Sequence, residues 1–305
     1  MKERKGIVLF TTILLIMALL SIVMVFLNST KKVKDTLSYE YAQIQSNIIM
    51  YNLVEYFNGI KFDEEVIFYG AGVPFTMEFG DALVNLEFNS AHDKLNINAF
   101  SETIKTKDNT TYNNFITYLY SYRVKDPDLF VDLLLDTIDV DNLEKNSGNG
   151  SEIALKEPLF RNGKIYNKEH FKYIIDYYIQ QTDDKDILKV PFENFISFNS
   201  PDIDINFASK ELLDIIFYDA NNFILETISK HTDIYYKLDD LPFDHYYLEN
   251  IKKGRFGQSI TTTTNILDVK VELNFNGKFN SNIRFFYDIK NKKLTQYKVK
   301  NIDIY

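Results

Sequence analysis

The feature that most constrains this chain is an uncharged apolar run near its N-terminus. The run extends from Ile7 to Leu27 and is interrupted only by Thr11, Thr12 and Ser21. About 20 consecutive apolar residues are enough for a helix to cross the hydrocarbon layer of a bilayer. The run is too long for the core of an ordinary signal peptide, and no small-x-small cleavage site follows it. The sequence therefore predicts a single transmembrane anchor.

Basic residues flank this run on both sides. Those before it are Lys2, Arg4 and Lys5, and those after it are Lys31, Lys32 and Lys34. The positive-inside count is close to a tie, so only the short leader and the long tail favour a cytoplasmic N-terminus. With that orientation, the large C-terminal part of the chain lies outside the cytoplasm.

The helix need not end at the membrane surface. Apolar residues recur further along at alternating spacings of four and three, at Leu37, Tyr41, Ile44, Ile48 and Tyr51. This is the period of an amphipathic helix, and neither Pro nor Gly occurs before Gly59 within this segment. One helix on the order of 75 Å long is predicted from Ile7 to about Phe57. A membrane anchor, a short linker and a separate core helix would fit the same pattern.

Beyond Gly59 the apolar pattern changes. Two short strand-like runs come first, at Glu65–Tyr69 and Leu83–Phe88. From about Asn96 to Arg255 the apolar residues keep mostly helical spacing. The stretch Asn142–Ser151 within this block is polar and contains glycine, which is typical of a loop.

The C-terminal part has the clearest pattern. Apolar and polar residues alternate between Val269 and Ile289, and Asn276-Gly277 in the middle predicts a type I′ turn. A second turn is predicted at Asn291-Lys292, followed by a strand over Leu294–Val299. These strands form an antiparallel meander with one buried face. Strands on both sides of a helical block indicate one α+β domain with a helical insertion, or two domains in series.

Composition and charge exclude several function classes. A net charge of −9 and a pI near 5.1 argue against a nucleic-acid partner. The chain has no Cys, which removes disulfides, zinc–cysteine sites and thiol nucleophiles. The phosphate-binding loop, the G-x-S-x-G elbow and the H-E-x-x-H motif are also missing. We therefore expect no enzymatic activity.

Four short motifs occur in an order that resembles a known family. Arg4-Lys5-Gly6 followed by Ile7-Val8-Leu9 is similar to a prepilin peptidase site, with cleavage between Gly6 and Ile7. The segments Lys94–Ala99, Leu135–Asp141 and Asp204–Ala208 resemble three internal elements of the same family. On these residues the chain resembles the K-type minor pseudopilins of type II secretion systems. Thr11 stands where most pilins have Glu, as is characteristic of the K-type subunit.

The resemblance implies a fold and a division of the chain. The fold is α+β: a long transmembrane pilin-like helix packs on an antiparallel sheet, with a large helical, SAM-like insertion between the sheet strands. The implied division is a leader at 1–6, a transmembrane and amphipathic helix at 7–58, the first part of a pilin-like domain at 59–95, the insertion at 96–255 and closing strands at 256–305.

The acidic stretch that follows the helical run at Leu129–Leu135 is the best candidate for chemistry. Ca²⁺ prefers six to eight oxygen ligands, and closely spaced carboxylates with loop carbonyls can supply them. Calcium binding is implied by the resemblance, and it would fall on Asp139, Asp141 and Glu152, with Asp136 as a further ligand. A solvated helix end in which these Asp residues act as caps fits the same stretch.

A second acidic stretch, Asp202–Asn206, alternates strictly between polar and apolar residues. This alternation indicates an extended segment that enters a helix capped by Ser209, rather than a second metal loop.

The function implied by the resemblance is structural. The chain would be a minor pseudopilin at the tip of a type II secretion pseudopilus, in the inner membrane with its C-terminal domain in the periplasm. Its partners would be the I-type and J-type minor pseudopilins, the assembly platform and the prepilin peptidase. Leu37, Tyr41, Ile44, Ile48 and Tyr51 would pack against helices of other subunits.

Two other functions fit the same sequence features. A membrane-anchored extracytoplasmic sensor or ligand-binding domain would keep Met1–Gly6, which a processed pseudopilin would lose. A minor pilin of a DNA-uptake or type IV pilus system would share every feature used above.

Overall fold

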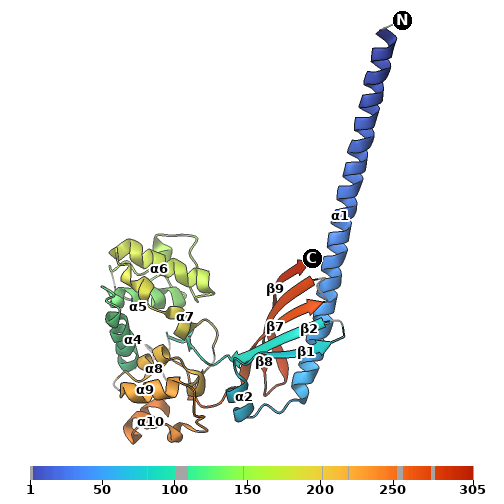
Figure 1. The fold of residues 1–305 in the computed structure, drawn as a ribbon. Helices are drawn as coiled ribbons and strands as arrows, with labels where there is room; N and C mark the ends of the chain where they lie inside the picture. Colours follow the sequence, from blue (N-terminus) through green and yellow to red (C-terminus); the bar gives the residue numbers. More distant parts are fainter. Residues whose placement is uncertain are drawn as a thin grey trace.

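The computed structural model places a long helix against an antiparallel sheet and sets a lobe of short helices beside them (Figure 1). The structure describes residues 3–80, 82–100, 109–146, 148–200, 202–218, 220–252, 257–275 and 279–304. At residues 3–16, 18, 109–111, 250, 279 and 299–304 it describes the backbone alone. The predicted turn at Asn276-Gly277 lies outside these ranges.

The long helix is α1, Glu3–Gly59, and it is continuous. The single helix that the sequence predicts is confirmed, and the alternative with a linker between two helices is wrong. Hydroxyl groups inside the helix do not interrupt it, because Thr30 and Thr36 each donate to a carbonyl four residues earlier. The N-terminal half of α1 extends well beyond the sheet, whereas its C-terminal half lies against it (Figure 1).

The sheet has five antiparallel strands in the order β1-β2-β7-β8-β9. Two strands precede the insertion, β1 (Phe75–Phe79) and β2 (Ala82–Ser90). Three follow it, β7 (Ile266–Phe275), β8 (Phe279–Asp288) and β9 (Lys293–Ile304). The C-terminal meander is confirmed, and β9 is longer than predicted. Its long pairing with β8 contains two register shifts.

The α1 helix covers the apolar face of the sheet. Alternate residues of β2 and β7 are buried, as a period of two requires when one face is covered. The Phe57 ring lies 5.3 Å from the ring of Tyr287 and 6.2 Å from that of Phe285, measured between centroids. The Tyr287 hydroxyl donates to Asn58 Oδ1 at 2.9 Å, so the end of the helix is fixed to β8 by a polar contact as well.

The segment Glu65–Tyr69 was predicted as a strand, and that prediction is wrong. It forms the short helix α2, Glu64–Gly70. Asp63 caps this helix, since its carboxylate accepts a hydrogen bond from Val66 N at 3.0 Å. Two glutamates in the first turn also interact favourably with the helix dipole. These capping signals outweigh the β propensity of the short apolar run.

The insertion lies between β2 and β7 and has its own core. The core is centred on fully buried residues such as Phe130, Tyr178 and Phe195. Its α-helices are α4 (Asn109–Ser121), α5 (Pro127–Ile138), α6 (Lys168–Thr182), α7 (Phe192–Phe195), α8 (Lys210–Ile216), α9 (Asn222–Ser229) and α10 (His245–Lys252). Short 3-10 turns connect them: η1 (Ile97–Ala99), η2 (Ile153–Leu155), η3 (Asp186–Lys189), η4 (Ile205–Phe207) and η5 (Leu238–Asp240).

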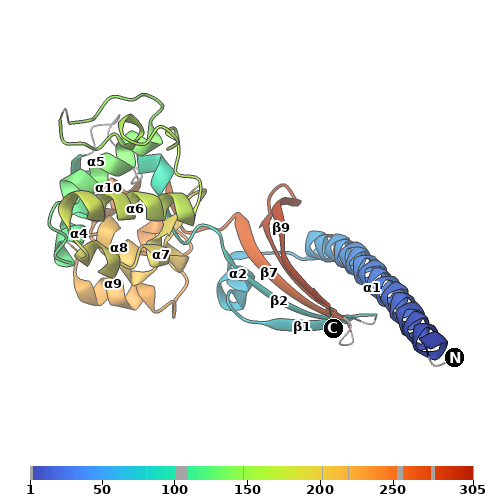
Figure 2. The same ribbon diagram turned by 90° about the horizontal axis from the view of Figure 1, so that it is seen from above.

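Two short parallel strand pairs lie within the insertion. They are β3 (Leu95–Asn96) with β4 (Ile196–Ser197), and β5 (Ile203–Asp204) with β6 (Ile260–Thr261). Seen from above, the insertion lies on the far side of the sheet from α1, across a narrow junction (Figure 2). The helical lobe therefore projects away from the long helix.

Candidate functional site

Two apolar stripes on the C-terminal half of α1 face in different directions. One is buried against the sheet and consists of Ala42, Ile49, Met50, Leu53 and Phe57. The other contains the five residues predicted to pack against other subunits, with exposed fractions between 49% and 69%: Leu37, Tyr41, Ile44, Ile48 and Tyr51. The sequence predicted a single apolar stripe, so it found the exposed face and missed the buried one. A row of large apolar side chains at the surface is typical of an interaction site.

The N-terminal half of α1 carries the predicted leader and membrane span. Gly6 and Ile7 lie in its helical backbone, and their side chains fall outside the described residues. Over the part of the chain whose side chains are described, no helix contains a stretch long and apolar enough to cross a membrane. The predicted span from Ile7 begins in the part where only the backbone is described.

The predicted acidic residues come together where α5 ends. Asp136 is completely buried, and both of its carboxylate oxygens accept from Lys145 N at 3.2 Å. One of them also accepts from Ser151 Oγ at 2.5 Å. Burial raises the pKa of Asp136 to about 6, and these hydrogen bonds oppose the shift. A buried, fully hydrogen-bonded carboxylate positions the surrounding loop.

Asp139 lies beside Asp136 at the C-terminal end of α5. Its Oδ2 accepts from Lys145 Nζ at 2.7 Å, so the same lysine contacts Asp136 through its backbone and Asp139 through its side chain. The hydrogen bond that Lys145 Nζ donates to Asp139 raises the pKa of Lys145. The other oxygen of Asp139, Oδ1, is buried and has no hydrogen-bond partner.

Asn162 connects the two remaining predicted residues. Its Nδ2 donates to Glu152 Oε1 at 2.8 Å and to the backbone carbonyl of Asp141 at 3.1 Å. Glu152 follows Ser151 directly, so a continuous set of contacts joins Asp136, Ser151, Glu152, Asn162 and Asp141. Hydrogen bonds therefore connect all four acidic residues predicted from the sequence, Asp139 through Lys145 and Asp141 through its backbone carbonyl.

Capping also occurs in this cluster. The Asp141 side chain accepts from Leu143 N at 2.9 Å, and Glu152 accepts from Ala154 N at the start of η2 at 3.1 Å. The predicted solvation is wrong for Asp136, which is fully buried, and Glu152 is only 1% exposed. Tertiary contacts with the loop after α5 exclude water from them.

Three oxygen atoms of the cluster are buried without a hydrogen-bond partner: Asp139 Oδ1, Glu152 Oε2 and Asn162 Oδ1. Buried polar atoms are normally satisfied, and an unsatisfied carboxylate oxygen is costly. In the part of the chain that the structure describes, no three His, Asp or Glu side chains gather closely enough to hold a metal ion by themselves. The unsatisfied set instead combines two carboxylates and one amide, which are the oxygen donors that Ca²⁺ accepts.

Sequence reasoning missed Asn162, and it missed Asp132 nearby. Asp132 is 4% exposed, and its Oδ2 accepts from Asn146 Nδ2 at 2.5 Å and from Asn149 Nδ2 at 2.7 Å. Burial raises the pKa of Asp132 against these two hydrogen bonds. An isolated Asn in a loop has no distinctive spacing, so no sequence signal marked Asn162. The two Asn residues in the glycine-containing loop were the only available signal for Asp132.

The alternating segment Asp202–Asn206 is extended and leads into a helix, as predicted. Ile203 and Asp204 form β5, η4 follows, and Ser209 Oγ accepts from Leu212 N at 3.2 Å at the start of α8. Asp204 lies at the junction between the lobes, where its Oδ2 accepts a hydrogen bond from Thr264 Oγ1 at 2.7 Å.

These features define a class of fold: a long helix on an antiparallel sheet, interrupted by a helical lobe between its second and third strands. No family model matches the sequence, and no curated protein matches it. A chain in the crystal structure of the GspK–GspI–GspJ complex from the enterotoxigenic Escherichia coli Type 2 Secretion System has a similar fold, with a TM-score of 0.56 and 11% sequence identity.

The similarity extends over 90% of this chain and 99% of the solved one, so it includes both lobes. The fold is therefore that of a GspK-like minor pseudopilin.

Proposed function

We propose that this chain is a minor pseudopilin that joins or initiates a pseudopilus of a type II secretion or related type IV pilus-like system. The observation that carries the proposal is the fold similarity over 90% of the chain. The exposed stripe Leu37, Tyr41, Ile44, Ile48 and Tyr51 supports it, because a fibre of parallel helices would cover that stripe. The proposed role is structural and requires no catalysis.

In this proposal the N-terminal half of α1 anchors the protein in the inner membrane, and the C-terminal domain lies in the periplasm. Prepilin peptidase would cleave between Gly6 and Ile7. Thr11 supports a first position in the fibre. A carboxylate in the hydrocarbon layer is costly without a partner, and a first subunit has no preceding neighbour to supply one.

The position of the insertion favours the fibre tip. The helical lobe projects from the side of the sheet opposite α1 (Figure 2). A subunit with such a projection fits poorly between others stacked along a shaft, whereas the end of a fibre leaves it free. The partners would be the I-type and J-type minor pseudopilins, together with the assembly platform.

We also propose that the cluster at the end of α5 binds Ca²⁺. Asp139, Glu152 and Asn162 would supply the three unsatisfied side-chain oxygens, and the Asp141 carbonyl lies in the same cluster. Asp136 would hold the loop through Lys145 and Ser151. The bound cation would neutralise carboxylates that burial otherwise destabilises, and so it would fix the loop between α5 and α6.

The decisive experiment is to determine the N-terminus of the membrane-extracted protein by mass spectrometry, with and without the prepilin peptidase. A mature chain that starts at Ile7 only when the peptidase is present is the expected result. An intact Met1 under both conditions would contradict the pseudopilin proposal and favour an anchored sensor domain. Affinity purification with the neighbouring pilin-like subunits then separates a secretion system from a DNA-uptake or type IV pilus system.

A further inference from the structure

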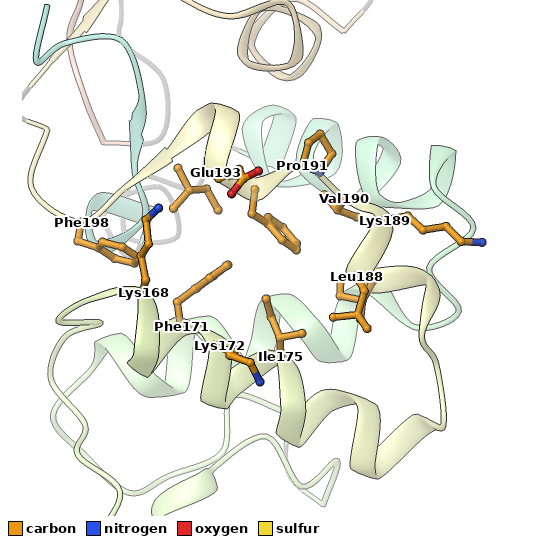
Figure 3. Close-up of a pocket in the computed structure, with 13 residues that line it drawn as sticks. Lys168, Phe171, Lys172, Ile175, Leu188, Lys189, Val190, Pro191, Glu193 and Phe198 are labelled. Atoms are coloured by element: carbon orange, nitrogen blue, oxygen red, sulfur yellow. The ribbon is translucent and has the colours of Figure 1, made fainter. Parts of the chain in front are cut away.

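A groove on the insertion lies apart from the acidic cluster and from α1. It has a volume of about 480 Å³ and runs between α6 and the segment from η3 to α7 (Figure 3). Ligand sites in proteins usually measure about 300–1,000 Å³, so this groove is large enough for one or two side chains of a bound peptide.

The floor of the groove is apolar. Phe171 and Ile175 from α6 face Val190 and Phe192 across it, and each of these residues is at most 9% exposed. Leu188 extends the apolar surface to the rim, where 61% of it is exposed. A large aliphatic residue exposed beside an apolar groove adds contact area for a bound group.

The rim is basic. Lys168, Lys172 and Lys189 line the groove, and Glu193 is the single acidic residue among its lining. A fourth lysine, Lys94, donates to the backbone carbonyl of Glu193 at 2.7 Å. The chain as a whole carries a net charge of −9, so this concentration of positive charge is local and runs against the overall balance.

These lysines are available to a ligand. Lys172 pairs with Asp176 and Lys189 pairs with Asp186, but all four side chains are between about one third and three quarters exposed. Exposed pairs of this kind contribute little to stability, so they exchange readily with a competing carboxylate. Within the described part of the chain, Lys168 has no ion-pair partner, and Figure 3 shows its side chain beside Phe198 at the edge of the groove.

We propose that this groove binds an acidic peptide segment of a partner protein. One aliphatic or aromatic side chain of the segment enters between Phe171, Ile175 and Val190, while flanking carboxylates pair with Lys168 and Lys172. The two components act differently: apolar burial supplies affinity, and the lysine rim selects for negative charge. Leu188, exposed at the margin of the groove, adds apolar contact for the rest of the segment. This inference does not depend on fibre assembly.

The test uses the full chain in lipid nanodiscs, which avoids free detergent that would fill an apolar groove. Binding is followed by fluorescence anisotropy with short fluorescein-labelled peptides that carry a central Leu, Ile, Phe or Tyr between aspartates. Two control peptides replace the aspartates with lysines or the central residue with serine. We expect saturable binding of at least one acidic peptide, weakened by salt, and no binding of either control.

Two variants localise the binding. The double variant Lys168→Glu/Lys172→Glu should weaken it at least about tenfold, whereas Lys290→Glu/Lys293→Glu, two exposed lysines of the sheet lobe, should leave it unchanged. Leu188→Ser should weaken it several-fold without affecting folding, because Leu188 is exposed.

Three results would overturn the proposal. The first is the failure of every acidic peptide to bind, and the second is equal binding by the charge-reversed groove variant. The third is saturable binding of laurate or of a second copy of this chain at the groove in place of the peptides.

Discussion

The two lobes of this protein are built in opposite ways. The core of the sheet lobe joins α1 near the N-terminus to β7 and β8 near the C-terminus, so its contacts are distant in sequence. The core of the insertion comes from one continuous part of the chain between β2 and β7. The sheet lobe carries the exposed apolar stripe of α1, whereas the insertion carries the acidic cluster and the basic groove. The proposed assembly surface and the proposed ligand sites therefore lie on different lobes.

A polar network joins the two lobes. Ser90 at the end of β2 and Thr264 before β7 are hydrogen-bonded at 2.6 Å, and Thr264 also donates to Asp204 of the insertion. Asp204 N donates to the carbonyl of His92 at 2.8 Å. His92 itself is buried, and neither ring nitrogen has a hydrogen-bond partner, although Nδ1 lies 4.0 Å from Asp202 Oδ2. A junction of this kind is sensitive to ionisation, because it holds titratable groups away from water.

The largest expected effects come from the two cores. Phe130→Ala in the insertion and Phe285→Ala in the sheet lobe each remove a fully buried ring and should cost about 3–5 kcal/mol. Differential scanning calorimetry of the full chain tests whether the lobes unfold separately. We expect each substitution to lower mainly the transition of its own lobe. Equal shifts of all transitions by both variants would mean that the lobes form one cooperative unit.

The next effect concerns the junction and pH. Burial raises the pKa of Asp204 to about 7, against hydrogen bonds from Thr264 and Asn206 N. The folded state therefore binds more protons than the unfolded state between about pH 4 and pH 7, and stability falls as pH rises through this window. The ionised carboxylate costs on the order of 3–4 kcal/mol at the upper end.

Asp204→Asn should remove this dependence. His92 acts with the opposite sign, since burial lowers its pKa and stability is lost as pH falls below its ordinary value. The useful quantity is thus the difference in melting temperature between the protein and Asp204→Asn, measured at pH 5 and pH 8. Asp186→Asn, a partly exposed position, is the control. Identical pH profiles for the protein and Asp204→Asn would refute the role assigned to Asp204.

Calcium should stabilise the insertion by a smaller amount. A ligand at a hundredfold excess over its Kd adds about 2.7 kcal/mol to the free energy of unfolding. We expect Ca²⁺ to raise the melting transition of the insertion and EGTA to lower it, with no change in the sheet lobe. Glu152→Gln and Asn162→Ala should abolish the shift, whereas Asp176→Asn, on the exposed face of α6, should preserve it. A shift that survives in Glu152→Gln would place the cation elsewhere.

Substitutions in the exposed stripe of α1 should have the smallest effect on stability and the largest effect on assembly. Ile48 and Ile49 are adjacent in α1, with exposed fractions of 49% and 4%. Ile48→Ala should change stability by less than about 0.5 kcal/mol but reduce co-purification with other pilin-like subunits. Ile49→Ala should instead cost about 2–5 kcal/mol in the sheet lobe. If neither variant loses assembly, the exposed stripe is not part of the proposed interface.

Much of the architecture was predictable because it depends on periodicity. The continuous helix followed from the absence of Gly and Pro between Ile7 and Gly59, and the meander followed from the alternation between Val269 and Ile289. The strand prediction for Glu65–Tyr69 was wrong because a run of five residues carries little periodic signal. The cap at Asp63 favours a helix there. Asn162 was missed because its importance arises only from contact with Asp141 and Glu152.

The sequence by itself therefore determined the long N-terminal helix, the helical block and the C-terminal meander, and it proposed four acidic residues for a candidate site. Only the tertiary structure decided which face of α1 is covered, since Ile48 and Ile49 are the same residue type and differ only in what packs against them. It also decided that Asp136 and Asp204 are buried and that lysines distant from Lys94 in sequence gather beside it at one groove. Periodicity is a local property of the chain, whereas burial and charge clustering depend on segments that meet only after folding.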